Sequence, residues 1–316
     1  MVGMDIAGNS ERTDDGNAKR RGRIGLWSAS LGGVEIPQLR DIVAELDSQG
    51  WESLWFGEAI GREAFAQAQI LLEATERMRI GTGIANIWAR DAHASASIGR
   101  TYEALYPGRF VLGLGVSHAP LVQRRSHDYN KPLAAMRDYV SAINSTRPEA
   151  AGEETLPDIV LAALGPKMLE LAGTETSGAH PYLTTPEHTA RAREILGGDA
   201  DSGPLLVVEQ GAVIAPSAVT DVEEWRRRAH DHLEMYTGLP NYRNSWKRLG
   251  FDDSDFVRGG SERLAEALIP RGIEATIAAV DAHFEAGASH VLVQVLGPSV
   301  LEPPVEDWRL LAEALR

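Results

Sequence analysis

The sequence predicts an α/β fold in which eight parallel strands close into a (β/α)8 barrel with helices outside. From residue 24 onward, short apolar segments alternate with segments of helical periodicity, which is typical of a parallel sheet covered by helices. Eight such units in 316 residues suit a closed TIM barrel better than an open doubly wound sheet. The first strand–helix turn also lacks the G-x-G-x-x-G pattern of a dinucleotide-binding fold.

The strands are expected where short, mostly apolar runs stand between glycine, proline or polar residues. They are residues 24–28, 53–57, 79–85, 110–115, 159–163, 178–183, the paired runs 205–208 and 213–214, and 290–295.

Helices are expected between these strands. Residues 37–49, for example, place Leu39, Ile42 and Leu46 on one helical face and are followed by Gly50 as a stop signal. The expected helices are residues 37–49, 64–76, 92–105, 131–145, 166–173, 221–236, 273–286 and 305–315, with one more beginning at Pro186.

Two less regular stretches are expected to be rim-loop insertions that form the walls of a substrate pocket, because functional loops are usually the irregular parts of a barrel. They are residues 118–130 and 238–260. Tyr129, Tyr242 and Trp246 lie within them, which predicts a partly aromatic pocket surface.

Composition narrows the class of protein. The net charge of −14 argues against nucleic-acid or anionic-membrane partners, which require a basic surface. The absence of cysteine excludes disulfides and thiolate metal sites, and no apolar run reaches the roughly 18 residues of a membrane span. We expect a cytoplasmic protein with a disordered tail over residues 1–22 and one barrel domain over 23–316.

The glycine-containing stretch 107–118 has two interpretations. Gly113 and Gly115 leave no side chain where a strand ends, so a ligand phosphate could approach the backbone amides that follow. Alternatively, both glycines only make room for a neighbouring strand.

Residues at the carboxyl ends of the strands are the candidates for an active site, because barrel enzymes place their sites there. Glu58 is interpreted as an acid, a base or a hydrogen-bond anchor, or as the partner of a salt bridge to Arg62 or Arg90. His118 is interpreted as a substrate-binding or proton-transferring residue, or as a polar residue at a helix start. The other rim residues are Trp27, Ser28, Asn86, Arg90, Ser117, Leu164, Gly165, His180, Gln210 and Gln294.

The usual signatures of metal and nucleophilic catalysis are absent from the sequence. His230 and His232 are two apart and so lie on different faces of a helix. There is no H-E-x-x-H motif and no G-x-S-x-G elbow. No metal site is therefore expected.

Four stretches, in this order along the chain, make residues 23–295 resemble the bacterial luciferase-like superfamily, and within it the deazaflavin (F420)-dependent oxidoreductases. They are residues 50–58 (GWESLWFGE), residues 80–86 (IGTGIAN) with Arg90 and Asp91, residues 107–115 (PGRFVLGLG), and residues 162–168 (AALGPKM).

The resemblance implies a luciferase-like barrel, usually a homodimer, whose mouth holds a flavin-type cofactor beside a small-molecule substrate. It also implies a non-proline cis peptide at Gly83–Ile84. The cofactor-binding residues that it implies are Gly83, Ile84, Asn86, Gly115, Val116, Ser117, Leu164 and Gly165. Such a cofactor performs the redox step while the protein supplies position and electrostatics.

One departure from the family affects the expected chemistry. Many relatives carry an acidic residue followed by histidine at the end of the second strand, whereas this chain has Glu58 followed by Ala59. Glu58 and His118 are therefore the expected catalytic residues, and the alcohol- and sugar-oxidising chemistry of the histidine-bearing relatives is not transferred.

Three functions are compatible with these observations. The preferred one is F420-dependent hydride transfer, favoured mildly over FMN by the arginine-rich, lysine-poor composition that is typical of a GC-rich genome. The alternatives are an FMN-dependent monooxygenase and a cofactor-binding member without turnover. The fold alone does not decide between them.

Overall fold

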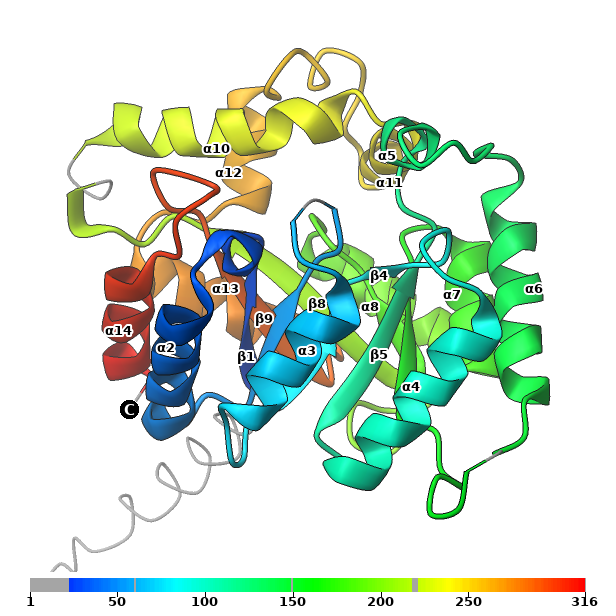
Figure 1. The fold of residues 1–316 in the computed structure, drawn as a ribbon. Helices are drawn as coiled ribbons and strands as arrows, with labels where there is room; N and C mark the ends of the chain where they lie inside the picture. The colour runs from blue at the N-terminus through cyan, green and yellow to red at the C-terminus, as the bar shows by residue number, and fades with distance from the viewer. Residues whose placement is uncertain (1–22, 60, 149, 218–220, 316) are drawn as a thin grey trace, which may run out of the picture.

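The strands of the computed structural model, which describes residues 23–59, 61–148, 150–217 and 221–315, form a closed parallel barrel (Figure 1). The expected barrel is therefore confirmed, whereas the expected disordered tail, residues 1–22, lies outside the described residues. The strands are β1 (Ile24–Ser28), β2 (Ser53–Phe56), β3 (Arg79–Thr82), β4 (Ala85–Asn86), β5 (Phe110–Gly115), β6 (Asp158–Ala162), β7 (Gly178–His180), β8 (Leu205–Ala212) and β9 (His290–Val295).

Neighbouring strands pair in the order β3-β2-β1-β9-β8-β7-β6-β5-β4, and a further β3–β5 pairing closes the ring. The strands β3 and β4 are two parts of the third barrel strand, since β3 pairs with both β2 and β5 while β4 pairs with β5. The segment between them, Gly83–Ile84, contains a cis peptide bond, as the family resemblance predicted.

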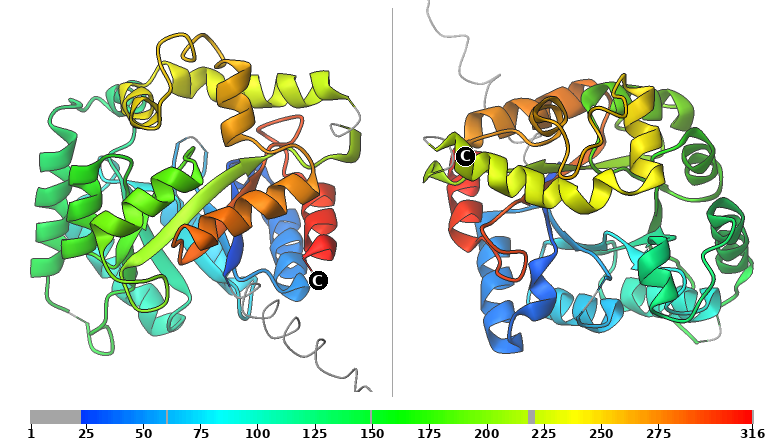
Figure 2. Two further views of the ribbon diagram at one scale, coloured as in Figure 1. Left: turned by 180° about the vertical axis from the view of Figure 1, so that it is seen from behind. Right: turned by 90° about the horizontal axis from the view of Figure 1, so that it is seen from above.

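Helices follow the strands and surround the barrel (Figure 2). They are η1 (Ser30–Gly33), α2 (Ile36–Gln49), α3 (Ala64–Glu73), α4 (Ala92–Leu105), α5 (Ala119–Gln123), α6 (Pro132–Ser145), α7 (Pro166–Glu175), α8 (Pro186–Leu196), α10 (Val222–Thr237), α11 (Pro240–Arg248), α12 (Glu262–Leu268), α13 (Ile273–Glu285) and α14 (Val305–Ala314). Among the residues that the structure describes, no helix is both long and apolar enough to cross a membrane.

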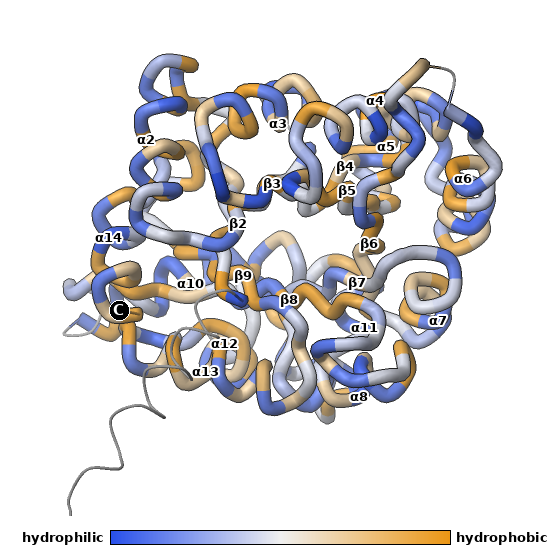
Figure 3. The backbone as a smooth tube through the Cα atoms, turned by 90° about the horizontal axis from the view of Figure 1, so that it is seen from below, coloured by the Kyte–Doolittle hydropathy of each residue, from blue (hydrophilic) through white to orange (hydrophobic). Residues whose placement is uncertain are grey.

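The strands are buried on both faces, as in other parallel barrels, and the ring that they form is enclosed by the helices (Figure 3). The main core lies between the strands and the surrounding helices. Inside the barrel, Trp55, Val111, Val160, Val207 and Leu292 form a separate apolar layer.

The inward positions two residues further along these strands explain the hollow at the barrel mouth. Side chains alternate between the two faces of a strand, so Gly57, Ala162 and Glu209 follow Trp55, Val160 and Val207 on the inner face. Two of these three residues are small. The mouth therefore remains open above a filled interior.

The stretch 238–260 is more regular than we expected. It contains the helix α11, and with α10 and α12 it builds a second apolar cluster. These three helices lie over one end of the barrel (Figure 1). The polar composition of α11 obscured it, although Pro240 at its start and the four-residue spacing of Tyr242 and Trp246 are helix signals.

Candidate active site

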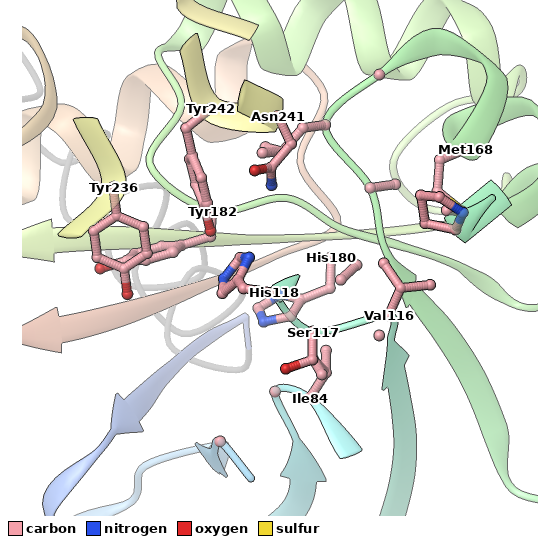
Figure 4. Close-up of a pocket in the computed structure, with 18 of the residues that line it drawn as sticks. Ile84, Val116, Ser117, His118, Met168, His180, Tyr182, Tyr236, Asn241 and Tyr242 are labelled. Atoms are coloured by element: carbon pink, nitrogen blue, oxygen red, sulfur yellow. The ribbon is translucent and has the colours of Figure 1, made fainter. Parts of the chain in front are cut away.

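A cavity of about 570 Å³ occupies the barrel mouth. Its walls come from the carboxyl ends of the strands, from the loops that follow them and from α10 and α11. Figure 4 shows the rings of His118, His180, Tyr182, Tyr236 and Tyr242 grouped on one side of this cavity. Active sites of (β/α)8 enzymes occupy the same place in the fold.

The structure brings most of the predicted site residues together. The predicted residues that line the cavity are Glu58, Gly83, Ile84, Gly115, Val116, Ser117, His118, Leu164 and Gly165. Asn86 is not brought to the cavity: its side-chain oxygen accepts a hydrogen bond from the Trp88 amide at 3.0 Å, and the residue is buried. The carboxamide of Asn86 therefore holds the backbone of the loop that follows β4.

Glu58 is an anchor for the wall of the cavity. Both of its carboxylate oxygens accept hydrogen bonds from the Arg90 guanidinium, one of them at 2.9 Å, so the alternative of a salt bridge to Arg90 is what the structure shows. One oxygen also accepts from the Asn86 amide at 2.8 Å. The Glu58 amide donates to the Ile84 carbonyl at 3.1 Å. A carboxylate held in this way has little capacity left to act as a base.

Arg90, the partner of Glu58, is itself largely buried. Burial acts to lower the pKa of Arg90, but its pairing with Glu58 and Glu63 outweighs this effect and raises the pKa. The guanidinium therefore stays charged, and the Glu58–Arg90 pair joins the end of β2 to the loop after β4.

His118 begins α5, but its side chain makes no capping hydrogen bond to that helix. The imidazole lines the cavity, and its ring centroid lies 6.0 Å from that of Tyr242. Burial lowers the pKa of His118, so the ring is neutral at pH 7 and can donate one hydrogen bond and accept another.

The two glycines of β5 have different reasons for lacking a side chain. A Cβ atom at Gly113 would lie 1.9 Å from the Thr82 carbonyl oxygen, and one at Gly115 would lie 2.4 Å from the Ile84 side chain. The packing interpretation is thus correct for Gly113. Gly115 makes room for Ile84 and also lines the cavity, and Ser117 beyond it has a positive φ of 58°.

Two titratable groups from adjacent strands lie side by side at the base of the cavity. His180 of β7 and Glu209 of β8 are both buried and both line the cavity. The His180 Nδ1 atom is 2.9 Å from the Val207 carbonyl oxygen, which therefore accepts its hydrogen, while Nε2 lies 3.5 Å from Glu209 Oε2. Burial lowers the pKa of His180 to about 4 and raises that of Glu209 well above its usual value.

His180 was among the rim residues expected from the sequence, but Glu209 was missed. The apolar runs 205–208 and 213–214 frame Glu209, whereas β8 in fact continues to Ala212. Side chains two residues apart in a strand share a face, so a strand extended beyond Val208 would have placed Glu209 on the same face as Val207.

Tyrosine side chains complete the wall of the cavity, in agreement with the partly aromatic pocket surface that the sequence predicts. Tyr129 and Tyr242 line it together with Tyr182 and Tyr236. Trp246 does not: it is fully buried, and its indole N–H donates to the Leu183 carbonyl at 2.9 Å. Trp246 supports the wall from behind.

The Tyr182 hydroxyl separates this cavity from a second one of about 380 Å³. It donates to Gln294 Oε1 at 2.5 Å and is hydrogen-bonded to His232 Nε2. Both of these partners line the second cavity. Gln210, another rim candidate, faces the outer helices instead, where its side-chain oxygen bonds His283 Nε2 at 2.9 Å.

Within the described ranges, no group of three or more histidine, cysteine, aspartate or glutamate residues is arranged to hold a metal ion. The cations that line the cavity are Lys167 and Arg248, on the side where β6 ends and α7 begins.

The fold and the site define the class: a closed (β/α)8 barrel whose cavity lies at the carboxyl ends of the strands. The profile of the luciferase-like monooxygenase family matches residues 22–288, and the chain belongs to this family. Its relatives include F420-dependent oxidoreductases.

One such relative is a protein of Mycobacterium tuberculosis assigned as a coenzyme F420-dependent oxidoreductase. It is 30% identical over 192 residues, which cover 59% of this chain and 52% of the relative.

Two solved structures share the fold at low identity. An F420-dependent secondary alcohol dehydrogenase with an F420–acetone adduct has a TM-score of 0.68 at 16% identity, and the match covers 93% of this chain and 99% of that one. The oxygenating constituent of 3,6-diketocamphane monooxygenase from Pseudomonas putida, in complex with FMN, has a TM-score of 0.65 at 14% identity, with 92% and 96% covered.

Proposed function

We propose that this protein is an F420-dependent oxidoreductase that transfers a hydride between the deazaflavin and a small organic substrate. The observation that carries the proposal is the cavity wall around Gly83, Ile84 and Gly115, at the barrel mouth of a chain related to F420-dependent oxidoreductases. When bound, F420 supplies the two-electron hydride chemistry.

The residues present fit such a cofactor. A Cβ atom at Gly83 would lie 2.5 Å from Trp27 Nε1, and one at Gly115 would meet Ile84, so the Trp27 and Ile84 side chains pack directly against the backbone of this wall. Small and aliphatic residues, Gly57, Ala59 and Ile84, leave a surface against which a flat ring can pack. Lys167 and Arg248 provide positive charge for an anionic group.

The chain's own residues then have distinct tasks. Ile84, held by the amide of Glu58, would support one face of the ring. The amides of Val116 and Ser117 would face a phosphate, as the family resemblance implies. The tyrosines and His118 on the other side of the cavity would enclose the substrate (Figure 4).

Titration of the purified protein with F420 and, separately, with FMN tests the proposal by the change in cofactor fluorescence. We expect saturable F420 binding that is tighter than FMN binding. Tight binding of FMN without binding of F420 would overturn the proposal in favour of an FMN-dependent monooxygenase, the function that the FMN-bound structural neighbour illustrates.

Turnover is a second test. The F420-loaded protein should oxidise or reduce at least one member of a panel of ketones, imines and activated alkenes, followed by the absorbance of F420. Binding of F420 without turnover on the whole panel would contradict hydride transfer.

A further inference from the structure

We propose that Glu209 is the proton donor of the site, and that it delivers its proton to the oxygen of a carbonyl substrate. This inference rests on the proposed hydride transfer and deepens it by naming a catalytic acid and a substrate class.

The position of Glu209 connects it with the cofactor wall. Its Oε2 atom lies 3.5 Å from His180 Nε2, and the same nitrogen lies 3.0 Å from the place that a Cβ atom of Gly83 would occupy. The carboxyl group is therefore close to the Gly83–Ile84 wall. A substrate stacked on a ring at that wall would lie within reach of Glu209.

The carboxyl group has a free position for a ligand. Its Oε1 atom is buried and has no hydrogen-bond partner, although the residue lines the cavity. A buried polar atom without a partner is unfavourable, and a hydrogen bond from or to a ligand polar atom would remove that penalty. The side chain is only 2% exposed, so bulk water is a poor substitute.

The surroundings of Glu209 favour the protonated acid. Burial raises its pKa, and among the described residues the ion-pair partner within 4 Å of its carboxyl group is His180, which is neutral because burial lowers its pKa to about 4. Tyr182, Tyr236 and Tyr242 on the same side of the cavity have pKa values raised by burial and are also neutral. A neutral acid donates a hydrogen bond, which suits an uncharged acceptor such as a carbonyl oxygen.

Two other polar groups at the cavity are already engaged. The carboxylate of Glu58 accepts hydrogen bonds from Arg90, and the hydroxyl of Tyr182 donates to Gln294. The Oε1 atom of Glu209 has no such partner among the described residues.

In the proposed step the carbonyl carbon would receive a hydride, with its two electrons, from reduced F420, which would thereby be oxidised. The electron pair of the C=O π bond forms a new O–H bond with the proton of Glu209, whose own O–H bond breaks. The products are an alcohol, oxidised F420 and the Glu209 carboxylate, which takes up a proton from solvent after the alcohol leaves.

Infrared difference spectroscopy tests the protonation of Glu209 without any cofactor. The wild type minus Glu209→Gln should show the carbonyl stretch of a protonated carboxylic acid at pH 7, and this band should shift in D2O. The matched control is Glu52→Gln, which alters a half-buried carboxyl that lines neither cavity and whose pKa burial also raises. Absence of a Glu209 band would overturn the proposal.

Cofactor binding and kinetics test the role itself. Glu209→Gln should bind F420 within about threefold of the wild type, reduce carbonyl compounds with kcat lowered on the order of 100-fold or more and KM little changed, and lose the solvent isotope effect on kcat. An unchanged kcat, or F420-linked reduction of imines and alkenes but of no carbonyl compound, would overturn the proposal.

The two proposals fail in distinguishable ways. A wild type that does not bind F420 refutes the proposed function and the proton-donor role together. A wild type that binds F420 and turns over, beside a Glu209→Gln variant with equal kcat, refutes only the role of Glu209.

Discussion

The most informative single residue for the wall of the cavity is Glu58, whose backbone and side chain hold the two sides of the Gly83–Ile84 segment. Its amide bonds the Ile84 carbonyl, and its carboxylate bonds the Asn86 amide and Arg90. The sequence identified Glu58 from its position at the end of a strand, but it left the choice between acid, base and anchor open. The contacts favour the anchor.

We predict that Glu58→Ala lowers the free energy of unfolding by about 2 kcal/mol, because it leaves a largely buried guanidinium and a backbone amide without their acceptor. F420 affinity should fall at least tenfold, since the ring-supporting segment loses its anchor. Thermal or urea unfolding and fluorescence titration measure the two effects.

The control for this prediction is Glu63→Ala. Glu63 also pairs with Arg90, but its side chain is 51% exposed and does not line the cavity. This variant should lose about 1 kcal/mol through its helix cap and keep its F420 affinity. Equal affinity losses in the two variants would contradict the anchoring role.

The residues that the sequence did and did not reveal differ in a physical way. Ser117 and His118 follow a strand end directly, so strand assignment was enough to place them at the mouth. Glu209 and Asn86 required knowledge of which way a side chain points. That orientation depends on the register of β8 and on the path of the chain after Ile84, and neither is visible as an apolar pattern.

At the scale of elements, α11 covers part of the barrel mouth and forms one wall of the cavity. It presents Asn241, Tyr242, Asn244 and Arg248 to the cavity and is fixed from behind by Trp246. Strands and long helices could be located from their periodicity. The short polar helix α11 is instead stabilised by the tertiary packing of Tyr242 and Trp246, and the periodicity of a sequence says little about tertiary packing.

We predict that Trp246→Ala destabilises the protein by about 3–5 kcal/mol, the usual cost of removing a buried tryptophan, and that it weakens F420 binding because α11 loses its attachment. Trp308→Ala is the matched comparison, since Trp308 is equally buried but belongs to α14 and lines neither cavity. It should lose comparable stability and retain binding. Parallel loss of binding in both variants would show that the effect is only one of stability.

For the whole molecule, closure of eight parallel units was predictable because each unit repeats the same alternation of buried strand and amphipathic helix. Because the units repeat, an error in predicting the bounds of one strand or helix does not change the predicted architecture. The chemistry of the site is not repeated in this way and depends on single positions, so it was predicted less completely.

Acid should destabilise the whole fold at a relatively mild pH. Burial lowers the pKa values of His180, His232 and His283 to about 4 and that of His290 to about 3, while an unfolded histidine titrates near about 6.5. Between these values the unfolded chain binds protons that the folded chain does not, so stability falls as the pH falls from about 6.5 to 4.

The measurement is the urea midpoint at a series of pH values from 7.5 to about 4. The midpoint should decline steadily below about pH 6.5, and His283→Gln should flatten the decline because it removes one of the four groups. The raised pKa of Glu209 acts in the opposite direction, since the folded chain holds a proton there that the unfolded chain has lost, but it is one group against four histidines. A midpoint that is independent of pH between 6.5 and 5 would contradict the burial of neutral histidines.

The contact of Gly115 with Ile84 means that these two positions are not free to vary independently. A methyl group added at Gly115 would overlap the Ile84 side chain, so Gly115→Ala should lower the melting temperature and F420 affinity when made alone. Combined with Ile84→Ala, which removes the overlapping atoms, the same substitution should recover part of that stability, and a double-mutant cycle would report the coupling energy. The order of substitution therefore matters in evolution. A lineage that changes Gly115 first meets the overlap, whereas one that shortens Ile84 first makes room for the second substitution.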